Sequence, residues 1–87
     1  MTDQEWRDLL VGFETHLAAE KGLAALTVRN YKNDLQPLYE YVRLKGLSGV
    51  DALDRRSLRG YLAWLVELGY VKSSVVRKLS VLRSLLR

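Results

Sequence analysis

The chain has 87 residues, is 48% hydrophobic and carries a net charge of +4, which indicates one globular domain over residues 1–87 rather than disorder. It contains no cysteine and one histidine, which excludes disulfides and argues against a zinc site or any other metal site. No apolar run is long enough to span a membrane and the acidic N-terminus is unlike a signal peptide, so we expect a cytoplasmic protein.

The charge is distributed unevenly along the chain. Residues 1–20 contain five acids and a single base, Arg7, whereas the stretch from Leu68 to the end contains five bases and no acid. A basic face attracts polyanions, and nucleic acid is the commonest such partner. Uneven charge that serves only solubility is the alternative at this point.

The first predicted helix covers about residues 3–20. Thr2 and Glu5 have the spacing of a capping box, and the helix should end at Lys21-Gly22. Its apolar side chains recur at steps of three and four residues. These are Trp6, Leu9, Leu10, Phe13 and Leu17.

The second predicted helix covers about residues 28–45, with Thr27 as its N-cap and Gly46 after its end. Pro37 lies inside it and should kink the helix, because proline lacks the donor that the preceding turn needs. The apolar stripe consists of Val28, Tyr31, Leu35, Leu38 and Val42.

After a loop over 47–53, two further helices are predicted at about 55–68 and 74–86. Asp54 should cap the third helix, and Ser73 or Ser74 the fourth. No segment alternates as a strand would, and the connections are short, so we predict an all-α fold, a compact four-helix bundle. The stripes expected to face inward are Leu58, Tyr61, Leu62 and Leu65 in the third helix, and Val75, Leu79, Leu82 and Leu86 in the fourth.

No residue pattern indicates an active site. The carboxylates Glu14, Glu20 and Asp34 lack the spacing of a general acid and base, and His16 is expected at the surface or in packing. Glycine-rich phosphate loops are absent. We therefore expect neither an enzyme nor a cofactor nor a small-molecule substrate. The tyrosines of the helices, which we expect at the core or its rim, are Tyr31, Tyr39, Tyr41 and Tyr61.

The fourth predicted helix carries bases and small hydroxyls but no acid. At 100° per residue, its serines and Val81 cluster within about 60° of Arg77, opposite the apolar stripe. Small residues permit close approach to the major groove, where an arginine can bind guanine and the flanking lysine and arginine side chains can contact phosphates. A helix that is merely solvated would usually carry Glu–Lys pairs. The predicted DNA contacts on this helix are Ser73, Ser74, Arg77, Lys78, Ser80, Arg83 and Ser84.

The start of the second predicted helix is also polar and basic, and helix N-termini bind phosphate well. Ordinary capping and solvation explain this pattern equally well. For Arg55, Arg56 and Arg59, which belong to the third predicted helix, we favour the interpretation that they are simply solvated. The predicted DNA contacts from the second helix are Thr27, Arg29, Asn30 and Lys32.

Two segments of the chain resemble a known family. "EKGLAALTVRNYKNDLQPLYEYV" is similar to the first part of the core-binding domain of tyrosine recombinases of the phage-integrase and Xer type, through Thr27, Tyr31, Asp34 and Leu35. "SSVVRKLSVLRSLLR" resembles the last helix of that domain, through Leu79-Ser80 and Leu82-Arg83-Ser84. The order, spacing and length agree over nearly the whole chain.

This resemblance implies a SAM-like bundle that forms the N-terminal half of a recombinase clamp, with its second and fourth helices toward the major groove. The catalytic Arg, His and Tyr of the family belong to a second domain, so the expected function is binding of double-stranded DNA without cleavage. Neighbouring recombinase protomers are a further expected partner. We also expect that Arg77→Glu weakens DNA binding and leaves the fold intact.

Two other classes of protein remain open. A helical protein-interaction module would use exposed apolar residues such as Trp64 or Val81. A stand-alone helix-turn-helix regulator would use the third and fourth helices, which a short turn at Gly69 joins.

Overall fold

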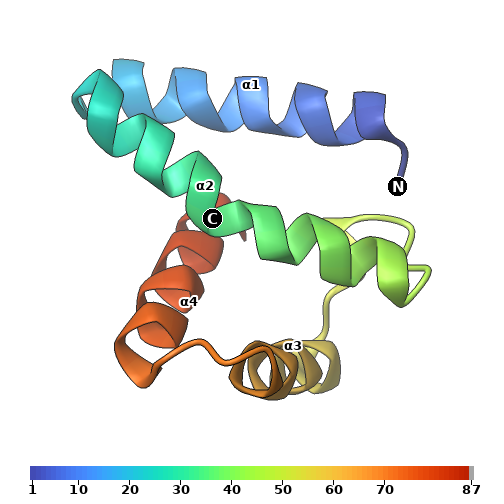
Figure 1. Cartoon of the computed structure of the whole chain (residues 1–87). Helices are drawn as coiled ribbons and strands as arrows, with labels where there is room; N and C mark the ends of the chain where they lie inside the picture. Colours follow the sequence, from blue (N-terminus) through green and yellow to red (C-terminus); the bar gives the residue numbers. More distant parts are fainter. Residues whose placement is uncertain (87) are drawn as a thin grey trace.

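The computed structural model describes residues 1–86 and contains only helices in that range. The prediction of an all-α fold is therefore confirmed. Arg87, one of the five bases of the last segment, lies outside the described residues. The predicted loop over 47–53 contains one short 3-10 turn, Val50–Ala52. The four α-helices, labelled in Figure 1, are α1 (Asp3–Ala19), α2 (Ala25–Leu44), α3 (Arg55–Glu67) and α4 (Lys72–Leu86).

Local hydrogen bonds explain where α1 and α3 begin. The Glu5 backbone N–H donates to Thr2 Oγ1 at 3.1 Å, and the Thr2 N–H donates to Glu5 Oε1 at 3.0 Å, so the predicted capping box is confirmed. Asp54 caps α3, since its Oδ1 accepts from the Ser57 N–H at 2.8 Å. After α1, the chain turns at Gly22 with φ 64°, a backbone conformation that favours glycine.

The predicted N-caps of α2 and α4 are wrong. Helix α2 already begins at Ala25, because the Val28 N–H donates to the Ala24 carbonyl at 3.0 Å. Helix α4 begins at Lys72, with a bond of 3.1 Å from the Val75 N–H to the Val71 carbonyl. Thr27, Ser73 and Ser74 therefore lie within the first turns of their helices. The side chain of Ala24, which precedes α2, makes no capping hydrogen bond.

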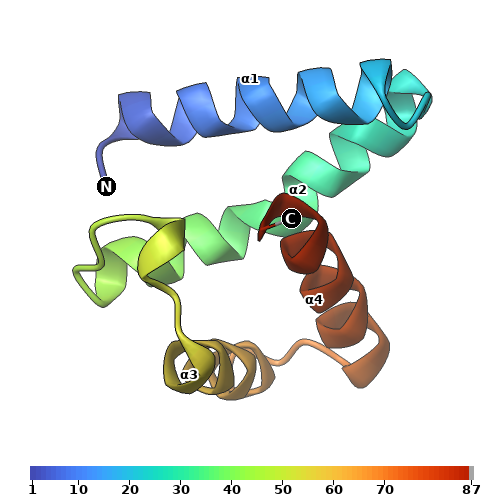
Figure 2. The ribbon, with the colours of Figure 1, turned by 180° about the vertical axis from the view of Figure 1, so that it is seen from behind.

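Helix α2 is the central element of the bundle and packs against each of the other three helices. Helices α1 and α2 run in opposite directions, joined by a tight turn, and α3 is seen nearly end-on below them (Figure 1). Viewed from behind, α4 climbs from the α3 end back to α2 (Figure 2). Helix α2 changes direction near its middle in Figure 1, as expected from Pro37.

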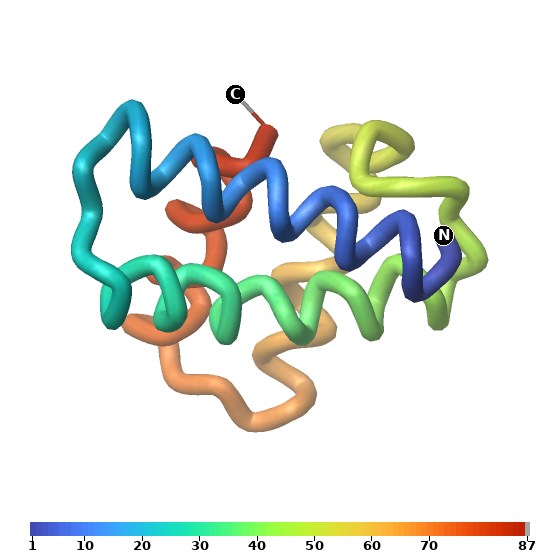
Figure 3. The backbone as a smooth tube through the Cα atoms, turned by 90° about the horizontal axis from the view of Figure 1, so that it is seen from above, coloured from blue at the N-terminus to red at the C-terminus, as the bar shows by residue number. Residues whose placement is uncertain are grey.

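The core draws on all four helices. Seen from above in Figure 3, α1 and α2 lie side by side, and α3 and α4 lie behind them. The predicted inward stripe of α1 and that of α2 are confirmed, since every member is buried or half-buried. The predicted tyrosines lie in the core or at its rim, with Tyr61 packed against Tyr41 at 5.3 Å between ring centroids. The fully buried side chains are Leu17, Leu35, Leu38, Val42, Tyr61, Leu65 and Leu82.

Helix α4 faces the core with a different side from the one predicted. Val81 and Lys78, expected on the outward face or at its edge, are only 3% and 6% exposed, whereas Leu86, expected inside, is 43% exposed. The helix is thus turned by about a quarter of a rotation relative to the prediction. The apolar residues of α4 spread over more than half of its circumference, so their spacing alone does not fix which part of that arc faces the core.

Two glycines inside helices should respond differently to alanine. A Cβ on Gly12 would meet open space, so Gly12→Ala should stabilise the domain by about 0.5–1 kcal/mol, as in an ordinary helix interior. A Cβ on Gly60 would lie 2.5 Å from the hydroxyl oxygen of Tyr41, whose ring is buried against Tyr61 and Trp64. We expect Gly60→Ala to lower the free energy of unfolding, as measured by urea denaturation. An equal gain in the free energy of unfolding for Gly12→Ala and Gly60→Ala would contradict the close packing of Tyr41 against Gly60.

Candidate nucleic-acid interface

A buried carboxylate joins α2 to α4. Asp34 accepts a hydrogen bond from Lys78 Nζ at 2.9 Å, and Arg77 bonds it through Nε at 3.0 Å and Nη2 at 3.0 Å. The side chains of Asp34 and Lys78 are 8% and 7% exposed, while that of Arg77 is 59% exposed. The Lys78 ammonium also lies 4.9 Å from the centroid of the Tyr70 ring, within cation–π range.

The two cations decide the ionisation of Asp34. Burial by itself raises the pKa of this carboxyl group, but the hydrogen bonds from Arg77 and Lys78, together with their positive charges, outweigh it and hold the pKa below its ordinary value. The same contact raises the pKa of Arg77. Asp34 and Arg77 therefore both stay charged at neutral pH.

The sequence contains a signal for this network, although neither Asp34 nor Lys78 was predicted to be buried. Asp34 lies three residues after Tyr31 and four before Leu38, which places it on the apolar stripe of α2. Likewise, Lys78 lies four residues before the buried Leu82. One acid and one base on two inward faces indicate a buried pair, because a lone buried charge would be too costly.

A polar hollow opens beside this network. Its volume is about 420 Å³, and its lining consists of Asn30, Asn33, Asp34 and Arg77. The structure thus brings together two predicted contacts, Asn30 of α2 and Arg77 of α4, and adds Asn33. Asp34 forms the buried side of the hollow, whereas the two asparagines are exposed.

Other predicted contacts lie on the exposed surfaces of the same two helices. Arg29 on α2 is exposed, as are Ser73, Ser80 and Arg83 on α4. Within residues 1–86, neither Arg29 nor Arg83 takes part in an ion pair. Their charges are therefore available to an external anion.

Several predicted contacts have other surroundings. Lys78 is buried against Asp34, and the prediction that it flanks an exposed face is wrong because α4 is turned. Lys32 is half-buried and donates to Glu14 Oε2 of α1 at 3.2 Å. Thr27 and Ser74 are also half-buried.

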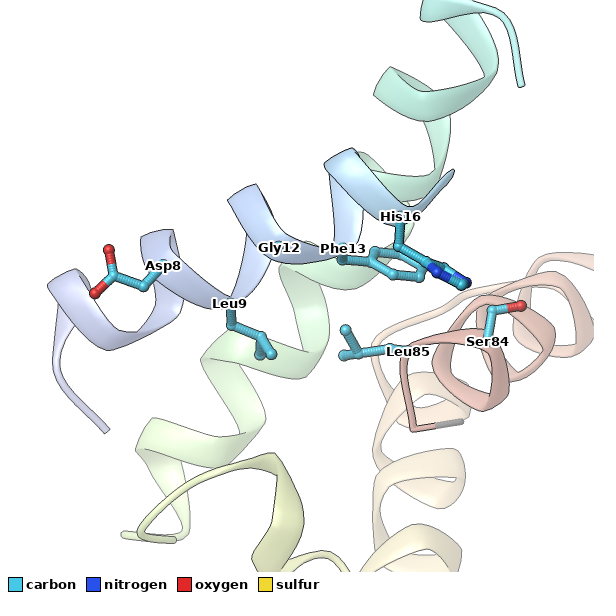
Figure 4. Close-up of a pocket in the computed structure, with 7 residues that line it drawn as sticks. All are labelled: Asp8, Leu9, Gly12, Phe13, His16, Ser84 and Leu85. Atoms are coloured by element: carbon cyan, nitrogen blue, oxygen red, sulfur yellow. The ribbon is translucent and has the colours of Figure 1, made fainter. Parts of the chain in front are cut away.

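Ser84 faces α1 rather than the hollow beside Asp34. It lines a pocket of about 360 Å³ between α1 and the end of α4, with Leu85 next to it. In Figure 4, the side chains of Phe13 and His16 extend from α1 toward this end of α4. His16 Nδ1 also lies 2.8 Å from Glu20 Oε2, so the expectation of a surface or packing histidine is confirmed.

The apolar residues that we named for a protein interface are not freely exposed. Val81 is buried, and Trp64 is half-buried with its ring 5.4 Å from that of Tyr41. In the described part of the chain, no cluster of acidic residues and histidine could hold a metal ion. Nor is any helix there long and apolar enough to cross a bilayer.

The ion-pair network should dominate the response of stability to mutation. Asp34→Ala leaves the buried Lys78 ammonium without its counter-charge, which we expect to cost about 3–5 kcal/mol of unfolding free energy. Adding Lys78→Met removes the unpaired charge and should recover most of that loss. The measurement is urea unfolding of both variants and of Lys78→Met alone. If the two single losses simply add in the double variant, the two side chains are not coupled.

Stability should also depend on acid pH through Asp34. Because its folded-state pKa is lowered, its contribution is complete above the ordinary value of 3.8 and is lost as pH falls through the folded-state value. The double variant Asp34→Ala/Lys78→Met should lose less stability between about pH 5 and pH 2 than the wild type does. Parallel acid-unfolding curves followed by circular dichroism would show that this carboxylate is not the cause.

Comparison with known proteins places the chain among recombinase domains. The family described as "Phage integrase, N-terminal SAM-like domain" matches residues 10–87. The chain is 36% identical over 75 residues to tyrosine recombinase XerC of Oceanobacillus iheyensis, and 38% identical over 76 residues to XerC of Pseudomonas aeruginosa. It is 35% identical over 78 residues to tyrosine recombinase XerD of Listeria monocytogenes.

These matches cover 86%, 87% and 88% of the chain, but only 25%, 25% and 26% of the respective relatives. The chain thus spans about a quarter of the length of the recombinases that it resembles. No solved structure matches it. The family match covers nearly all of α1 to α4, including both helices of the candidate interface, and the chain belongs to the phage-integrase N-terminal SAM-like domain family.

Proposed function

We propose that this domain binds duplex DNA as the non-catalytic core-binding part of a tyrosine recombinase or integrase, and that α2 and α4 form its DNA-binding surface. The observation that carries this proposal is the polar hollow between these two helices, which Asn30 and Arg77 line together. Arg29 and Arg83 are exposed on the same two helices. The recombinases that match the chain support the same function. Such a protein would act in the cytoplasm, where bacterial DNA lies.

The proposed surface divides the predicted residues by their positions. Exposed basic side chains contact the DNA phosphates. Small hydroxyl side chains such as those of Ser73 and Ser80 let the helix approach the duplex closely. Residues that are buried or half-buried act from behind this surface, by holding the helices that present it. These supporting residues are Thr27, Lys32, Ser74, Lys78 and Ser84.

The structure changes which variant tests this proposal best. Arg77→Glu would set a second carboxylate beside Asp34, so the expectation that this variant leaves the fold intact no longer holds. Arg29 and Arg83 are the better targets, because neither is paired within residues 1–86.

Loss of either free arginine should weaken DNA binding and reduce its salt dependence. We expect Arg29→Ala and Arg83→Ala each to lower the slope of log affinity against log salt by about one, since each removes one phosphate contact. The measurement is fluorescence anisotropy of a labelled mixed-sequence duplex at several salt concentrations.

Two arginines outside the surface serve as matched controls. Arg7 on α1 and Arg59 on α3 are both exposed, so their alanine variants remove the same charge elsewhere. If all four variants weaken binding equally, net charge rather than this surface governs the affinity. Absence of any binding at low salt, with the helices intact, would contradict the proposed function.

Protein interaction is a second candidate function, and exposed apolar residues favour it. Val66, Leu68 and Val71, around the connection between α3 and α4, are 62%, 53% and 64% exposed. We propose that neighbouring recombinase protomers contact this connection when they assemble on DNA. The family match favours this role over that of a stand-alone helix-turn-helix regulator.

A further inference from the structure

We propose that Asp34 is a positioning residue, which fixes the Arg77 guanidinium so that Arg77, Asn30 and Asn33 bind base edges in the major groove. This inference rests on the proposed function and assigns a separate task to one part of the DNA-binding surface. The polar hollow would discriminate between base pairs, whereas Arg29 and Arg83 would contact phosphates.

The geometry of Arg77 leaves the correct edge of its guanidinium free. The Asp34 carboxylate accepts hydrogen bonds from Arg77 Nε at 3.0 Å and from one N–H of Nη2 at 3.0 Å, which is a side-on contact. The end of the guanidinium still offers one N–H of Nη1 and the second N–H of Nη2, side by side. This parallel pair of donors matches the O6 and N7 acceptors of guanine.

The carboxylate also makes the hollow a weaker phosphate site than an unpaired arginine would be. Asp34 lies within hydrogen-bond distance of Arg77 and offsets part of its charge. Recognition of a base edge depends instead on the direction of hydrogen bonds, which a fixed guanidinium improves by reducing the side-chain freedom lost on binding.

The two asparagines complete the chemistry of a base-edge site. Asn30 and Asn33 line the same hollow as Arg77 and are exposed. Each carboxamide has both donors and acceptors, the combination that pairs with N6 and N7 of adenine. The guanidinium of Arg77 and the carboxamides of the two asparagines together indicate that this hollow binds a short stretch of duplex that contains both G·C and A·T pairs.

The test compares sequence preference with general affinity. A preferred duplex is first selected from a random pool with the wild-type domain, and affinities are then measured for it and for a scrambled duplex of equal composition. Arg77→Lys keeps the positive charge but loses the pair of parallel N–H donors. The preference for the selected duplex over the scrambled one should therefore fall by about 5- to 150-fold, toward equal binding. The salt slope should stay close to that of the wild type, because lysine keeps the positive charge.

The role of Asp34 is tested with a charge-neutral pair of substitutions. Asp34→Ala/Lys78→Met frees the guanidinium without changing the net charge, and the preference should again fall while scrambled-duplex binding persists. The matched control is Asp3→Ala/Arg43→Met, which removes the ion pair of 3.1 Å between α1 and α2. This control should keep the wild-type preference.

The possible outcomes separate the two proposals. An unchanged preference with Arg77→Lys, whose retained charge would preserve a phosphate contact, would make Arg77 a phosphate contact and overturn the inference. An unchanged preference in Asp34→Ala/Lys78→Met would reduce Asp34 to a structural role. Wild-type binding with no preference for any duplex would overturn the inference and leave the proposed function standing, whereas no binding at all would overturn both.

Discussion

The burial of one carboxylate between α2 and α4 constrains the rest of this small bundle. An isolated Asp34 at 8% exposure would be strongly destabilising, and so would an isolated Lys78 at 7%. Together, and with Arg77 at the rim, they satisfy one another, and no buried side-chain polar atom within residues 1–86 lacks a partner. The pair therefore fixes how α4 is rotated about its own axis, because any rotation that exposes Lys78 leaves Asp34 without its buried counter-charge.

That rotation has a direct consequence for the surface. It turns Val81 into the core and brings Arg77 to the margin between α2 and α4. The arginine that contributes to the ion-pair network is thus also the one that faces outward into the polar hollow with Asn30 and Asn33. Stability and the proposed recognition of DNA depend on the same three side chains, so neither can change without the other.

The acidic first helix gives the uneven charge of the chain a structural meaning. Two of its carboxylates, Asp3 and Glu14, pair with Arg43 and Lys32 on one side of α2. Exposed pairs of this kind add little stability, but they neutralise bases that lie away from the proposed DNA-binding surface. Arg29 and Arg83, which lie on the helices of that surface, take part in no ion pair within residues 1–86.

Much of the fold followed from local patterns. The capping box at Thr2, the Asp54 cap and the apolar stripes of α1 and α2 were predicted correctly, because each depends on neighbours within a few residues. The starts of α2 and α4 were placed three and two residues too late, since alanine and lysine tolerate helix well. The polar, acid-free character of α4 was also visible, and with it the residues from which the candidate interface is built.

The sequence alone determined four helices, their approximate bounds, the basic last segment and the family to which the chain belongs. Only the tertiary structure decided which side of α4 is buried, because the apolar residues of that helix spread over more than half of its circumference and its own periodicity does not select among them. The choice depends on Asp34, which lies 44 residues before Lys78. Each helix carries a charge at an inward position, but no local pattern shows that these two charges pair, and the contact gains its strength only when packing removes both from water.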